Sequence, residues 1–366
     1  MKNTHIIIIA VVCIAVVLAG VVGVLYISQP AQTIALSGAG ATFPVPLLTT
    51  MIDNYHNQQS HVSITYDAVG SGNGILSLQN KSRDFACSDA PLSASDRTKA
   101  PNALHIPETI GAVVVAYNIP EVSSGLHLSG KVLADIFSGK IITWNDEAIQ
   151  HLNPNITLPT QSITVVHRQE GSGTTFIFTS YLSEVSVDWN TAIGKGKTVN
   201  WQVGLAATGN PGVAEVVQAN AYAVGYVELA YVIENNMTAA AIENRLGNWV
   251  LPSLQSTQLA AQAGASSGLP AADNDWSGVS LLNTADAEAY PIVSFSYMMV
   301  YKELNVVSGM TNDKATALTD FLWWVIHDGQ DLAPNLDYAA LPSNVVEANE
   351  AAIRSITFNG RQVYTK

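Results

Sequence analysis

The first apolar run of the chain is long and carries no charge. From Ile6 to Ile27 it consists almost wholly of Ile, Val, Leu, Ala and Gly. Twenty-two helical residues at about 1.5 Å each span roughly 33 Å, which matches a bilayer core of about 30 Å. The apolar region of a secretory signal is usually only about 7–15 residues long. We therefore expect residues 1–30 to form a transmembrane anchor, with a cleaved signal as the alternative.

Beyond residue 32 the hydrophobic pattern alternates between two periods. Short β-branched runs predict strands at residues 33–36, 62–66, 111–118 and 163–166. Apolar positions at helical spacing predict helices that include residues 47–55 and 174–185. Alternating β and α units indicate an α/β fold with mainly parallel sheets. The stretch 253–275, rich in Ala, Ser, Gly and Gln, is typical of a surface insertion or flexible loop.

Charge and composition exclude several classes of protein. The chain has 16 basic and 29 acidic residues, a net charge of -13. This argues against a nucleic-acid partner, because such proteins need a basic surface. The mean hydropathy is +0.20, and the N-terminal run supplies roughly all of it. The remainder is a globular chain, neither a polytopic transporter nor a disordered or disulfide-stapled one. Lys2 before the apolar run orients everything after it outside the cytoplasm.

Three small-residue loops each join a predicted strand to a predicted helix. They are Gly-Ala-Thr-Phe-Pro at 40–44, Gly-Ser-Gly-Asn-Gly at 70–74 and Glu-Gly-Ser-Gly-Thr at 170–174. Small residues let the backbone approach a ligand, and the N–H groups and dipole of a helix start favour an anion. Ordinary helix capping explains any one of these loops. Three of them in one chain favour an oxyanion site.

Two charged residues lie close to these loops in the sequence. Arg168 comes just before the third loop, where its guanidinium could pair bidentately with an oxyanion or make a surface ion pair with Glu170 or Glu184. Asp89 follows an apolar run and could equally be a turn or cap residue.

Catalytic and metal signatures are missing from the sequence. The eight histidines have no metal-ligand spacing, and no nucleophile elbow surrounds Ser71 or Ser172. We therefore expect no enzyme activity, no metal and no cofactor.

Seven motifs follow one another in order along the outer part of the chain. They are LSGAGATFPVP at 36–46, CSDAPL at 87–92, TIGAVVVAYNIP at 109–120, GKIITWNDEAI at 139–149, RQEGSGTTF at 168–176, GYVE at 225–228 and LDYAALP at 336–342. In this order they closely resemble the motifs of periplasmic phosphate-binding proteins, the receptors of phosphate ABC importers. The likeness runs from Leu36 to the C-terminus.

The resemblance implies a two-domain clamp of the periplasmic-binding-protein type II kind that closes on one phosphate. Domain I would comprise residues 34–109 plus 291–366, and domain II residues 110–290, with hinge strands near 109–111 and 290–292. Glu170 stands where many relatives have Asp, and it would orient Arg168. The positions that match the family's ligand contacts are Thr42, Phe43 (through its backbone N–H), Ser71, Asp89, Arg168, Ser172, Gly173 and Thr174.

The sequence thus predicts an extracytoplasmic receptor that binds inorganic phosphate. By the resemblance it would deliver phosphate to an ABC permease and its ATPase subunit, as a monomer anchored by the segment from Ile6 to Ile27 unless this is cleaved. Asp89 would select phosphate, which keeps a proton at neutral pH, against sulfate, which has none. The alternatives are a receptor for sulfate or molybdate, a secreted phosphatase, and a scavenging or adhesion protein that serves no transporter.

Overall fold

A single large sheet runs through the molecule. The computed structural model describes residues 33–265 and 268–364. Within them the sheet has nine strands in the order β2-β1-β3-β12-β4-β8-β6-β7, and β9 pairs with β4 beside this path. Its strands are β1 (Ile34–Gly40), β2 (Val62–Asp67), β3 (Phe85–Ser88), β4 (Ala103–Asn118), β6 (Thr164–Arg168), β7 (Leu205–Ala207), β8 (Ala223–Glu228), β9 (Thr238–Ala239) and β12 (Val293–Tyr301).

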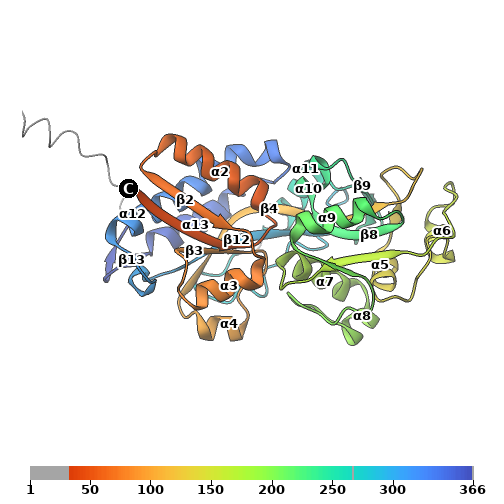
Figure 1. Cartoon of the computed structure of the whole chain (residues 1–366), viewed down its shortest axis with the longest axis horizontal. Helices are drawn as coiled ribbons and strands as arrows, with labels where there is room; N and C mark the ends of the chain where they lie inside the picture. The colour runs from red at the N-terminus through yellow and green to blue at the C-terminus, as the bar shows by residue number, and fades with distance from the viewer. Residues whose placement is uncertain (1–32, 266–267, 365–366) are drawn as a thin grey trace, which may run out of the picture.

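Helices gather around the two ends of this sheet, and β4 and β12 lie between the two groups (Figure 1). At the β1–β3 end are α2 (Val45–Gln58), α3 (Ser71–Gln79), α4 (Ala94–Lys99), α12 (Asn312–Ile326), α13 (Ser343–Arg354) and the 3-10 helices η1 (Leu304–Val306) and η2 (Asp328–Leu336). At the other end are α5 (Gly130–Phe137), α6 (Glu147–Leu152), α7 (Gly173–Val185), α8 (Val187–Ala192), α9 (Gly209–Ala219), α10 (Leu229–Glu234) and α11 (Leu254–Gly264). Small sheets hold β5 (His127–Leu128) with β10 (Ala241–Glu243) and β11 (Trp249–Val250), and β13 (Thr357–Phe358) with β14 (Arg361–Gln362).

The large sheet is mixed, so the expectation of mainly parallel sheets was wrong. β1 runs parallel to β2 and β3, and β6 runs parallel to β7 and β8. The central strands β4 and β12 are antiparallel to each other and to their outer neighbours β8 and β3. A continuous apolar run indicates burial on both faces. It does not give strand direction, which depends on partners far away in the sequence.

The predicted helices at residues 47–55 and 174–185 are confirmed as α2 and α7. Two loop boundaries differ from the prediction. β1 extends to Gly40 because it pairs with both β2 and β3, and α3 begins at Ser71, inside the predicted loop 70–74. The end of β1 and the start of α3 were missed because both are rich in glycine, which disfavours strand and helix alike.

Residues 253–265 are not a loop but contain a helix, which corrects the sequence prediction for this part of the stretch 253–275. This helix is α11, whose start is capped by Ser253, and α11 packs on β4 and β12. Ala260 and Ala261 are buried, and Trp276, just beyond the stretch, is 1% exposed. Alanine and serine have low hydrophobicity, but their small side chains allow the helix to lie close to the sheet.

No helix within residues 33–265 and 268–364 is both long and apolar enough to cross a bilayer. The predicted anchor from Ile6 to Ile27 lies outside the described residues. Of the two cysteines, Cys87 is a buried free thiol in β3.

A buried histidine ties β4 to two loops. His105 is 1% exposed, its Nε2 accepts a hydrogen bond from the backbone N–H of Leu92 (3.0 Å), and its Nδ1 donates to the carbonyl of Ala272 (3.1 Å). These roles require the neutral imidazole, because a protonated ring has no acceptor. Burial lowers the pKa of His105 to about 4.

This histidine predicts a loss of stability in mild acid. The unfolded chain binds the proton near pH 6.5 and the folded chain only near pH 4, so stability falls as the pH drops through this window. Between pH 7 and pH 5 the contribution of His105 to the free energy of unfolding should decrease by about 2 kcal/mol. Buried carboxyls such as Asp89 titrate in the same range with the opposite sign, so the readout is a difference: in urea unfolding, the change from pH 7 to pH 5 should be about 2 kcal/mol less favourable in the unmodified protein than in His105→Gln. His151→Gln, at an exposed position, is the control; equal slopes in both variants would contradict the assignment.

Candidate functional site

The three small-residue loops converge where strands of the large sheet end. Gly72 N–H donates to the carbonyl of Gly171 (2.8 Å), which joins the second loop to the third. A Cβ on Gly173 would lie 2.5 Å from Asp89 Oδ2 and 2.6 Å from Ser71 Oγ. The first loop follows β1, and the backbone N–H of Ala41 donates to Cys87 in β3 (2.9 Å). The structure therefore assembles the predicted site residues in one place.

Helices α2, α3 and α7 begin at these loops, at Val45, Ser71 and Gly173. The first N–H groups of a helix have no acceptor within the helix, and together with the helix dipole they favour an anion. Ser172 caps α7, since its Oγ accepts from the backbone N–H of Thr175 (3.1 Å). The Ser172 oxygen therefore acts as an ordinary helix cap, as the alternative interpretation expected. The proton of the same hydroxyl remains available to donate to a ligand.

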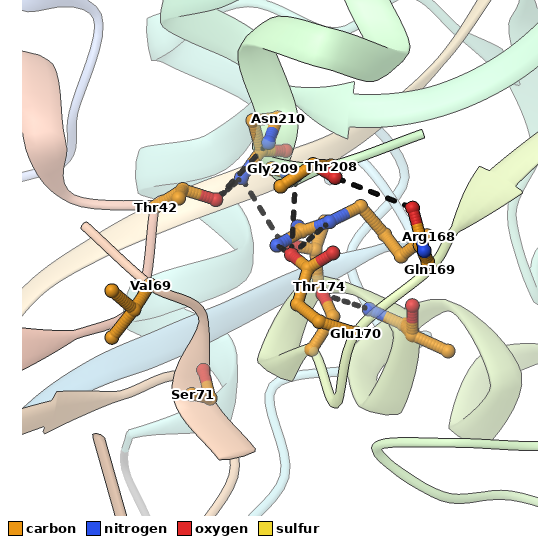
Figure 2. A network of polar contacts seen from close by, with 12 residues as sticks. Thr42, Val69, Ser71, Arg168, Gln169, Glu170, Thr174, Thr208, Gly209 and Asn210 are labelled. Atoms are coloured by element: carbon orange, nitrogen blue, oxygen red, sulfur yellow. Dashed lines mark hydrogen bonds and ion pairs between the residues drawn. The ribbon is translucent and has the colours of Figure 1, made fainter. Parts of the chain in front are cut away.

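Arg168 is buried at the end of β6 with one edge of its guanidinium occupied. Its side chain is 1% exposed, Nε donates to Glu170 Oε1 (2.9 Å), and Nη2 contacts the same oxygen. Nη1 points the other way and donates to Thr174 Oγ1 (3.3 Å), as Figure 2 shows. The longer glutamate side chain therefore does reach the arginine. Because the guanidinium is planar and rigid, the pairing of Nε and Nη2 with Glu170 also fixes the direction of Nη1.

Asp89 lies directly after β3 and is 1% exposed. Its Oδ1 accepts from Ser296 Oγ (3.0 Å), and its Oδ2 lies 3.5 Å from Ser71 Oγ. Burial raises the pKa of Asp89 to about 7, against the hydrogen bond from Ser296 and the charge of Arg168, which lower it. Asp89 is therefore poised near neutral pH to accept a proton that a ligand presents.

Three residues that the sequence reasoning missed hold the first loop. Thr42 Oγ1 accepts from both the backbone N–H of Asn210 (3.1 Å) and its Nδ2 (2.9 Å), leaving the Thr42 hydroxyl proton free to donate (Figure 2). Tyr231 OH donates to the Thr42 carbonyl, and Tyr338 OH to that of Phe43 (2.6 Å each). The sequence signals were a fourth small-residue loop, Thr-Gly-Asn at 208–210, opening α9, and the tyrosine of the LDYAALP motif.

The ring of Phe43 belongs to the core and not to the site. It is fully buried and meets Tyr338 edge-on, with ring centroids 6.4 Å apart. This arrangement leaves the backbone N–H as the group that Phe43 can offer. Among the residues the structure describes, no cluster of three or more His, Cys, Asp or Glu side chains could hold a metal ion.

A family model described as the PBP superfamily domain matches residues 27–328. The chain belongs to the PBP superfamily. Phosphate-binding protein PstS of Xylella fastidiosa is 39% identical over 332 residues, covering 88% of this chain and 86% of the relative. PstS of Methanocaldococcus jannaschii is 39% identical over 350 residues, covering 90% and 89%. These relatives confirm the resemblance inferred from the seven motifs.

Solved structures share the fold of this superfamily member. The periplasmic phosphate-binding protein PfluDING, bound with phosphate, has a TM-score of 0.67 at 22% identity, covering 87% of this chain and 93% of its own. The ancestral soluble variant of the human phosphate binding protein has a TM-score of 0.68 at 19% identity, with the same coverage. The predicted two-domain α/β binding-protein fold is thereby confirmed. The domain limits at 109–111 and 290–292 stay a prediction, as do the ligand contacts of the individual residues.

The Arg168–Glu170 pair predicts a specific cost of removing one charge. Glu170→Gln leaves the buried guanidinium without its counter-charge, so the free energy of unfolding in phosphate-free buffer should fall by roughly 3 kcal/mol. Asp275→Asn, whose carboxylate is 57% exposed and paired with Arg97, should cause no measurable loss. Urea denaturation of both variants decides the matter. A loss in Glu170→Gln as small as in the control would show that Arg168 does not depend on Glu170.

Proposed function

We propose that this protein is an extracytoplasmic receptor that binds inorganic phosphate between its two domains and delivers it to an ABC importer. The observation that carries the proposal is the buried Asp89 carboxylate, held beside Arg168 and three helix starts. A site built only for a fully deprotonated oxyanion gains nothing from a buried carboxylate, because the two negative groups repel each other. In a site for an oxyanion that keeps a proton, the carboxylate can accept a hydrogen bond from that proton.

The chemistry of the cradle fits phosphate. Hydroxyl and backbone N–H donors contribute roughly 0.5–1.5 kcal/mol per hydrogen bond, and charged ones up to about 3. Thr42, Ser172 and Thr174 supply hydroxyls, the helix starts supply N–H groups, and Arg168 supplies a cation. Asp89 accepts the proton of the ligand. The names of the relatives, which are phosphate-binding proteins, support the same ligand.

The proposal also covers the domain limits, the membrane tether and the transport partners of the receptor. Domain I comprises residues 34–109 plus 291–366 and domain II residues 110–290, and the hinge lies near residues 109–111 in β4 and 290–292 just before β12. The receptor is a monomer without catalytic activity, tethered through residues 6–27 unless this segment is cleaved. It docks on a phosphate permease served by an ATPase subunit.

Asp89 gives the sharpest test of this function. In calorimetric titrations of the full-length chain in detergent, phosphate should bind with micromolar or tighter affinity and sulfate far more weakly. Asp89→Asn removes the repulsion toward sulfate and the acceptor for the phosphate proton. The phosphate-over-sulfate preference should therefore fall by about tenfold or more, the equivalent of one charged hydrogen bond.

The matched control is Asp188→Asn, on an exposed side chain of α8, which should leave both affinities unchanged. Phosphate that gives no heat with the unmodified protein would refute the function. Discrimination that survives in Asp89→Asn would refute only the role of Asp89.

The net charge of -13 predicts how association responds to salt. The whole protein repels an anionic ligand, and salt screens this field beyond a Debye length of about 10 Å at 0.1 M. The association rate of phosphate, followed by stopped-flow fluorescence, should therefore rise with added sodium chloride. A rate that falls with ionic strength would show that the local field of Arg168 dominates the approach.

A further inference from the structure

A second buried carboxyl lies behind Asp89, and the site described above gives it no role. Glu108 is 2% exposed and lies in β4. The ladder between β4 and β12 shifts at this point, since Thr109 pairs with Ser296 and Pro107 pairs with Tyr297. Glu108 is thus the extra residue of a β-bulge. Bulges redirect a side chain and are common beside functional sites.

The bulge brings Glu108 to the same serine hydroxyl that contacts Asp89. Ser296 Oγ lies 3.0 Å from Glu108 Oε1 and 3.0 Å from Asp89 Oδ1. Glu108 and Ser296 lie in the paired strands β4 and β12, and Asp89 directly follows β3, which pairs with β12 on its other side. A hydroxyl has one proton to give. Both contacts are hydrogen bonds only if one of the two carboxyls carries a proton and donates it to Ser296.

The surroundings decide which carboxyl holds that proton. Glu108 faces the Cys87 thiol, with Sγ 3.9 Å from Oε2, together with Tyr66 from β2 and Asp89 itself. Burial and then the charge of Asp89 raise the pKa of Glu108 to about 8. Asp89 has the charge of Arg168 on its side, which opposes the rise in its pKa. The charge of Arg168 thus favours an ionised Asp89, and these surroundings favour a proton on Glu108.

We propose that Glu108 is a positioning residue that fixes Asp89 as a proton acceptor through Ser296. Protonated Glu108 donates from Oε1 to Ser296 Oγ, and Ser296 donates to Asp89 Oδ1. The thiol of Cys87 donates weakly to Glu108 Oε2, so each group has a consistent direction. Asp89 Oδ2 is then left as the acceptor beside Ser71 and Gly173, where the ligand proton would lie. This inference rests on the proposed function and extends it to the group that sets selectivity.

If Asp89 held the proton in place of Glu108, the preference for phosphate over sulfate would be lost. A proton on Asp89 would let it donate to sulfate as readily as to phosphate. Ionisation of Glu108 has a different effect. Two carboxylates would then share one hydroxyl proton behind the site, and the added negative charge would weaken binding of the phosphate anion.

We call the hydrogen-bond chain from Glu108 through Ser296 to Asp89 the relay. Glu108→Gln tests it, because the amide still donates to Ser296 but cannot ionise. Phosphate affinity and the preference over sulfate at pH 7 should match those of the unmodified protein. Between pH 7 and pH 9 the unmodified protein should lose up to about tenfold more phosphate affinity than Glu108→Gln, since one ionisation near pH 8 is linked to binding. Calorimetry over this range measures both. Parallel pH profiles, or loss of binding in Glu108→Gln at pH 7, would overturn the proposal.

Glu147→Gln, the same change at an exposed position in the first turn of α6, is the matched control and should keep the pH profile of the unmodified protein. A readout without ligand separates this inference from the proposed function. Infrared difference spectra at pH 7 should show the carbonyl band of a protonated carboxyl that disappears in Glu108→Gln and persists in Glu147→Gln. Failure of the unmodified protein to bind phosphate would defeat the function alone. Absence of that band difference would defeat the relay.

Discussion

The buried pair of Arg168 and Glu170 is the interaction on which the rest of the site depends. A guanidinium that is 1% exposed must be paired, because the loss of hydration otherwise costs several kcal/mol. Glu170 meets this need with a single oxygen, and the same Oε1 accepts from the backbone N–H of Gly209 (3.1 Å). Gly209 opens α9, and its neighbour Asn210 holds Thr42. Charge compensation of one arginine therefore also positions the first loop, which comes from the opposite end of the sheet.

Two tyrosines then set the orientation of the peptides in that loop. Tyr231 draws the Thr42 carbonyl toward itself, and Tyr338 does the same for the Phe43 carbonyl. A trans peptide is planar, so its N–H points opposite to its carbonyl. Fixing the Thr42 carbonyl thus directs the N–H of Phe43 to the other side of the chain. Tyr338 also lies 2.9 Å from the buried carboxyl of Glu228. The GYVE and LDYAALP motifs therefore act together to orient donors that neither of them contains.

The sequence predicted the components of the site better than its connections. Helix starts at Gly-rich loops depend on local conformation, so the loops near Thr42, Ser71 and Gly173 could be recognised from short stretches of sequence. The antiparallel direction of β4 and β12 could not, because it depends on pairing between residues almost 190 positions apart, such as Thr109 and Ser296. For the same reason no motif in the sequence indicated Glu108, which lies before the strand predicted at residues 111–118 and within β4 of the structure. Only the bulge brings it to Asp89.

The same geometry explains how an acidic protein can hold an anion. In the proposed site the Arg168–Glu170 pair is neutral as a unit and a protonated Glu108 adds no charge, which leaves Asp89 as the carboxylate that would face the ligand. Attraction must then come from N–H and hydroxyl dipoles at contact distance, whose effect is strong in a buried site and fades within a few ångströms. The field of the -13 charge extends further but is screened by salt. Capture and approach are therefore governed by different groups: the orientation of a few dipoles determines how tightly the ligand is held, whereas the surface charge affects how fast it arrives.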